Sequence, residues 1–132
     1  MFRVLLTTSF DVKLADLGLS DVRPRDAKPL RSRAGTAAFR APEVWGGGAV
    51  GCAADMFSYA CVLVCLVKQR GTPYARGVLR EVLERDVPAG TLSPELPETH
   101  AWYDVVVACG ACDPLERWSS ADVVRYFNET RI

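Results

Sequence analysis

Residues 54–67 read A-D-M-F-S-Y-A-C-V-L-V-C-L-V, and this nearly uninterrupted apolar run decides the fold. Its one charged side chain, Asp55, stands at the start, where a carboxylate is stabilised by the dipole of a helix. As a helix the run rises about 21 Å, which crosses a small domain but falls short of the roughly 20 apolar residues that span a bilayer. Its valines also suit a strand, but strands usually have about 3–10 residues. We expect a central helix over 54–67, buried on all sides because it is apolar on all sides, and a stop signal at 68–71.

Length and composition indicate one small globular domain. The 132 residues are 49% apolar and 24% charged, and 16 basic side chains balance 16 acidic ones. Overall charge therefore favours neither nucleic acid nor a membrane surface as a partner. Five cysteines, an odd number, do not suggest a disulfide scaffold, so we expect a reducing, intracellular (cytoplasmic) location.

The first part of the chain has strand-like and loop-like patterns. Residues 4–6 and 12–15 predict a β-hairpin whose turn lies at 7–11. Residues 21–35 are rich in basic residues and prolines and have no apolar period, so they predict an exposed loop, either functional or simply solvated.

The rest of the chain predicts helices joined by long loops. Pro42 can begin a helical turn, with Glu43 well placed in it. Residues 88–97 are rich in proline and predict a loop, and Ser119 or Ser120 can cap a last helix. We expect these positions to face the core: Val78, Leu79, Val82 and Leu83 in one helix, Trp102, Val105, Val106 and Cys109 in a helix over 102–112, and Val123, Val124 and Phe127 in the last. The predicted fold is mainly α, with a short N-terminal β-hairpin.

Four motifs together carry a family resemblance. In chain order they are K-L-A-D-L-G-L-S (13–20), G-T-A-A-F-R-A-P-E-V (35–44), A-D-M-F-S-Y-A-C-V-L (54–63) and D-P-L-E-R-W-S (113–119). Their order and spacing resemble the C-terminal lobe of the eukaryotic protein kinases, and a cysteine ahead of the last motif, Cys109, looks most like the tyrosine-kinase-like, serine/threonine type. The resemblance implies one partial kinase domain over 1–132: hairpin and metal-binding aspartate at 4–20, activation segment at 16–43, and helical body at 44–128.

The resemblance implies roles for several residues. Asp16, Leu17 and Gly18 match the family's metal- and ATP-binding Asp-Phe-Gly, in which the carboxylate, here Asp16, holds Mg²⁺ against the ATP phosphates. It also implies that Glu43 pairs with Arg117, and that Asp55 braces the catalytic loop.

The loop over 21–35 suggests regulation. By its place before Gly35, the resemblance implies that Ser32 is the phosphosite of the activation segment, with basic neighbours to neutralise a phosphate. Thr36 is expected to be a structural hydroxyl. The implied partners are a protein substrate or a segment of a partner kinase.

Much of the family's catalytic machinery does not match this sequence. A kinase needs a Gly-rich loop and lysine over the phosphates, a glutamate for that lysine, and a catalytic aspartate followed by asparagine. The position of that asparagine falls at Arg3, whose guanidinium cannot ligate Mg²⁺. We therefore expect the 132-residue chain to be catalytically incomplete, and the sequence upstream of Met1 to encode the missing parts. A non-catalytic, pseudokinase-like protein-binding lobe is the alternative.

Two further expectations concern surfaces and cysteines. The hairpin's apolar side chains, covered in a whole kinase, would be exposed here and could drive self-association. Cys109 and Cys112 have the spacing of half a zinc site or a redox pair, but zinc needs two more ligands and the sole histidine is His100.

Overall fold

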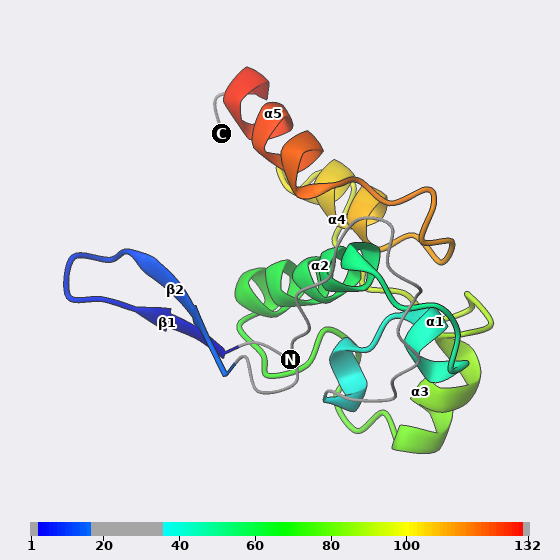
Figure 1. Cartoon of the computed structure of the whole chain (residues 1–132). Helices are drawn as coiled ribbons and strands as arrows, with labels where there is room; N and C mark the ends of the chain where they lie inside the picture. Colours follow the sequence, from blue (N-terminus) through cyan, green and yellow to red (C-terminus); the bar gives the residue numbers. More distant parts are fainter. Residues whose placement is uncertain (1–2, 17–35, 131–132) are drawn as a thin grey trace.

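The computed structural model describes residues 3–16 and 36–130 of the chain, which form a two-stranded sheet, one 3-10 helix and five α-helices (Figure 1). The elements are β1 (Arg3–Leu6), β2 (Val12–Ala15), η1 (Ala37–Phe39), α1 (Pro42–Trp45), α2 (Cys52–Lys68), α3 (Arg80–Asp86), α4 (Tyr103–Cys109) and α5 (Ser120–Thr130). The predicted fold class, mainly helical with a short N-terminal hairpin, is confirmed. None of the described helices is long and apolar enough to cross a membrane.

The predicted hairpin is present, and Figure 1 shows it projecting away from the helices. β1 and β2 pair antiparallel, and their turn closes where the Thr7 N–H donates to the Asp11 carbonyl at 3.0 Å. Residues directly opposite each other, and those two positions along, share one face of a sheet. One face of this hairpin therefore carries four apolar side chains, each between 48% and 65% exposed: Val4, Leu6, Val12 and Leu14.

The apolar run at 54–67 is the centre of the helical body, as predicted. α2 begins two residues earlier and ends one later, and Gln69 closes it in the left-handed conformation at φ 48°. The helix therefore ends within the stop signal predicted at 68–71, and Gln69, not the glycine at 71, takes the left-handed conformation. The expectation that α2 is buried on every side is wrong at Leu66, which is 62% exposed, because the described helices pack on only part of its circumference.

Two apolar clusters lie on different sides of α2. The first gathers Phe57 and Cys61 of α2 with η1, α1 and α3. The second gathers Leu63 and Val64 with α4 and α5. α2 therefore holds the N-terminal and C-terminal parts of the helical body together.

The outer helices differ in places from the predicted stripes. α3 starts only at Arg80, so Leu79 precedes the helix and is exposed, and α4 covers 103–109 rather than 102–112. Val105, Val106 and Cys109 are fully buried as predicted, and Phe127 packs on the second cluster. The inward position predicted for Val124 is wrong, because α5 contacts the body along a narrow stripe and leaves Val124 60% exposed.

Candidate functional site

The segment from Thr36 to Trp45 is fixed against α2 by a hydroxyl that sequence reasoning missed. Ser58, on the second turn of α2, donates its Oγ hydrogen to the Phe39 carbonyl at 2.8 Å. The buried Phe39 ring joins the first cluster, so this segment is held by both polar and apolar contacts. A serine within an apolar run is a sequence signal that could have identified this link.

Thr36 acts through its backbone. Its carbonyl accepts the Phe39 N–H at 3.0 Å, while its side chain makes no capping bond to η1 and the residue is exposed. The role of structural hydroxyl expected for Thr36 therefore stays a prediction.

Glu43 and Arg117 form the ion pair expected for them, across 74 residues of sequence. The pair is bidentate: Arg117 Nη1 donates to Glu43 Oε1 and Nη2 to Oε2, each at 2.8 Å. The Arg117 side chain is 0% exposed and that of Glu43 10%. Pro42 begins α1 and sets Glu43 in its first turn, so the short helix aims the carboxylate.

Arg117 is fully satisfied by other partners as well. Its remaining donor contacts are three backbone carbonyls, of Ala111 at 2.7 Å, Ala53 at 2.9 Å and Cys112 at 3.0 Å. Its guanidinium also lies 5.2 Å from the centre of the Phe57 ring. A buried guanidinium is tolerated only when its donors are paired, and this one joins α1, the start of α2 and the segment after α4.

Asp55 lies in the first turn of α2, as predicted, and is exposed. Desolvation by the surrounding protein raises the pKa of its carboxyl. The role expected for Asp55, bracing the catalytic loop, stays a prediction.

Asp16 directly follows β2 and is exposed, with a left-handed backbone at φ 63°. It is the only member of the expected metal and ATP site within the described residues, since Leu17, Gly18 and the proposed phosphosite Ser32 lie outside them. The residues that the structure describes contain no group of three His, Cys, Asp or Glu side chains able to hold a metal ion. Asp16 is therefore the one carboxylate that the described residues contribute to the expected metal site.

Cys109 and Cys112 have different surroundings, although their spacing suggested a metal or redox pair. Cys109 is fully buried, and burial raises the pKa of its thiol to about 11. Cys112 is exposed. Since the thiolate is the form that binds metals and attacks disulfides, Cys109 behaves as a packed apolar side chain.

Residues 3–126 match the family model of the protein kinase domain. A probable serine/threonine-protein kinase of Dictyostelium discoideum is 31% identical over 134 residues, and the serine/threonine-protein kinase mos of Patiria pectinifera is 35% identical over 130 residues.

These relatives are longer than the chain. The matches cover 96% and 92% of this chain but only 9% of the Dictyostelium protein and 36% of the Patiria protein. The family match covers nearly all of the described helices and both strands. The chain belongs to the protein kinase domain family.

Proposed function

We propose that the chain is the C-terminal lobe of a serine/threonine-type kinase domain and that, within a whole domain, it supports phosphoryl transfer from ATP to protein hydroxyls. The buried pair of Glu43 and Arg117 carries this proposal, because it closes the segment from Thr36 to Trp45, the end of the expected activation segment, onto the helical body. The two relatives described above, both named as serine/threonine-protein kinases, support the same type of substrate.

The described residues do not by themselves fit ATP and Mg²⁺. Mg²⁺ in kinases is bound through carboxylates together with the substrate phosphates, and the described residues contribute one carboxylate, that of Asp16. Catalysis of phosphoryl transfer depends almost entirely on positioning and electrostatics around the phosphates. The 132-residue chain by itself is therefore expected to transfer no phosphate.

A chimera tests the proposal. Residues 4–132 replace the matching segment of an active relative such as the Patiria kinase, and transfer of labelled phosphate from ATP to serine, threonine and tyrosine peptides is measured. We expect transfer to serine and threonine that is lost in Asp16→Ala, because the metal ligand is removed. Asp11→Ala, an exposed aspartate in the hairpin turn, is the matched control and should keep the activity.

The second candidate is a non-catalytic, pseudokinase-like lobe that binds protein. It is favoured by the metal site, to which the described residues contribute only the exposed carboxylate of Asp16. A chimera that folds and binds its partners but transfers no phosphate would support this second function and contradict the first. Transfer by the 132-residue chain alone, lost on Asp16→Ala, would contradict the expected inactivity.

A further inference from the structure

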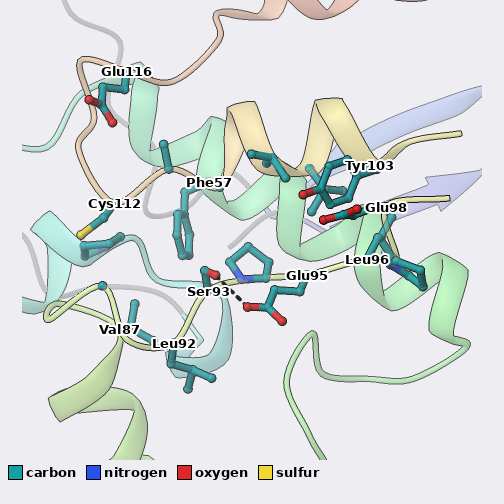
Figure 2. A pocket seen from close by; sticks show the side chains of 18 residues that line it. Phe57, Val87, Leu92, Ser93, Glu95, Leu96, Glu98, Tyr103, Cys112 and Glu116 are labelled. Carbon is teal, nitrogen blue, oxygen red and sulfur yellow. Dashed lines mark hydrogen bonds between the residues drawn. The ribbon is translucent and has the colours of Figure 1, made fainter. Parts of the chain in front are cut away.

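A groove on the helical body has no role in the function proposed above. It lies between the α3–α4 loop and α4, with a volume of about 590 Å³ (Figure 2). Figure 2 shows Tyr103 and Glu98 toward one end of the groove and Cys112 and Glu116 toward the other. Its size falls within the range of about 300–1,000 Å³ that is usual for ligand pockets.

The walls of the groove belong to the buried core. Leu96, Val106, Phe57 and Val87 line it and are each at most 6% exposed. Such side chains form the packed floor beneath the groove. The apolar surface open to a ligand belongs to the half-buried Leu92 and Tyr103 and to Val107, which is 51% exposed.

The α3–α4 loop is fastened to its surroundings at two points. At one point Pro94 packs so closely on the end of α4 that a Cβ at Gly110 would lie 2.9 Å from the Pro94 Cγ. At the other, Gly90 (φ 71°) approaches Cys112, whose Sγ would lie 3.4 Å from a Cβ there. These two contacts hold the loop against the end of α4 and the segment after it.

The charged side chains that line the groove are all acidic. Three of its lining side chains are carboxylates, Glu95, Glu98 and Glu116, and none is a cation. All three glutamates are exposed, and none takes part in the ion pairs formed among the described residues. Glu95 accepts only a long hydrogen bond, 3.4 Å, from the Ser93 hydroxyl. In a chain of zero net charge, this is a local excess of negative charge beside an apolar surface.

These features select one class of ligand. Phosphate groups would be repelled by three carboxylates. A metal ion is not favoured either, because the described residues hold no group of three ligands close enough to bind one. A ligand whose cationic groups are spaced by apolar groups matches both the separate carboxylates and the apolar walls.

We propose that this groove binds an extended protein segment in which arginine or lysine side chains alternate with apolar ones. The apolar side chains lie against Leu92 and Val107, and the cations reach the glutamates at the rim. The segment belongs to a partner protein, and its binding is independent of ATP.

The test uses the 132-residue chain and a fluorescein-labelled heptapeptide with three arginines separated by Ala-Leu, followed by fluorescence anisotropy. We expect saturable binding that the same peptide with glutamates in place of arginines does not show. Glu95→Gln with Glu98→Gln should weaken binding roughly tenfold, as expected for the loss of two exposed ion pairs of up to about 1 kcal/mol each.

The matched control is Glu81→Gln with Glu84→Gln, which removes the same charge from exposed positions of α3 outside the groove. This control should change the dissociation constant by less than about twofold.

Val107→Ser, an exposed lining residue of α4, should weaken binding through the apolar contact. Equal losses in the two glutamate pairs would show only general attraction to an acidic protein and would overturn the proposal. Absence of saturable binding to the parent chain would also overturn it. Unchanged melting temperatures show that the parent and the variants are folded in these measurements. The catalytic chimera described above is unaffected by either outcome.

Discussion

The helical body and the hairpin are both rich in valine and leucine, but they differ in what those side chains contact. In the body, α2 buries Phe57, Leu63 and Val64 between two clusters of helices. In the hairpin, an apolar face of four side chains has no cover among the described residues (Figure 1). Each side chain that is fully buried contributes about 1.5–3 kcal/mol relative to exposure, so the two regions make very different contributions to stability.

The polar contacts of the two regions also differ. The body buries one guanidinium, Arg117, and satisfies it with a carboxylate and three carbonyls. The hairpin turn has only exposed hydrogen bonds, such as that from the Ser9 hydroxyl to Asp11 at 2.8 Å. Because exposed hydrogen bonds compete with water, the hairpin depends on its backbone pairing and on whatever covers its apolar face.

The largest expected effect is on the body. Arg117→Ala should lower the free energy of unfolding by roughly 3–5 kcal/mol, because Glu43 and three carbonyls would lose a buried partner. This is a large part of the roughly 5–15 kcal/mol that stabilises a typical domain. Urea unfolding followed by circular dichroism measures it.

The control for Arg117 is Arg125→Ala. Arg125 pairs with Asp122 on α5, but its side chain is 64% exposed, so the loss should be no more than about 1 kcal/mol. Similar losses in both variants would contradict the view that burial makes the Glu43 pair the anchor of the body.

The next largest effect should come from close packing. Gly110→Ala places a Cβ 2.7 Å from the Val106 carbonyl oxygen and 2.9 Å from the Pro94 Cγ, so we expect a loss of about 1–3 kcal/mol. Gly71→Ala, whose added Cβ meets nothing within 4 Å, is the matched control and should change stability by less than about 1 kcal/mol. Thermal unfolding of both variants is sufficient, and an unchanged Gly110→Ala protein would mean that the loop is not pressed onto α4.

Substitutions in the hairpin should change the association of the protein and not its stability. Leu6→Thr with Leu14→Thr should change the unfolding free energy of the helices by less than about 0.5 kcal/mol, because neither side chain is buried. The same variant should reduce self-association in sedimentation experiments and lower the binding of apolar dyes, since the exposed face is an association hazard. Unchanged association would assign the aggregation surface to another region.

The smallest expected effect is the acid sensitivity of α5. Ser119 caps this helix, and its hydroxyl and N–H both donate to Asp122, at 2.6 Å and 2.9 Å. These hydrogen bonds hold the pKa of the Asp122 carboxyl below its ordinary value. The carboxylate therefore contributes stability that is complete above its unfolded pKa and is lost as the pH falls through the lower folded pKa.

Asp122→Asn should remove the loss of stability that this carboxylate causes at low pH. Melting temperatures at pH 7 and pH 3 would differ less in the variant than in the parent protein. Glu129→Gln, an exposed carboxyl of the same helix, is the control and should leave the pH dependence as it is. If the variant kept the parent's pH dependence, protonation of Asp122 would not be the cause of the lower melting temperature at pH 3.

Several features could be predicted from the sequence because they depend on neighbours along the chain. The length and apolar pattern of 54–67 predicted α2, and alternation on both sides of a polar turn predicted the hairpin. The ion pair of Glu43 with Arg117 was expected only through the family resemblance, since nothing in the local sequence joins residues 74 positions apart. The roles of Asp16 and Ser32 remain predictions.

Other features were decided by the tertiary structure. Whether Leu66, Leu79 and Val124 are buried depends on where neighbouring helices end and which face they cover, and a helical period states only which residues share a face. The groove likewise brings Glu116 of one loop together with Glu95 and Glu98 of another, and no sequence spacing links Glu116 to the other two. Local physics, mainly the apolar period, determined the elements of this protein. Packing between distant segments determined which apolar surfaces are buried and which charges meet, because both depend on contacts that form only when the chain has folded.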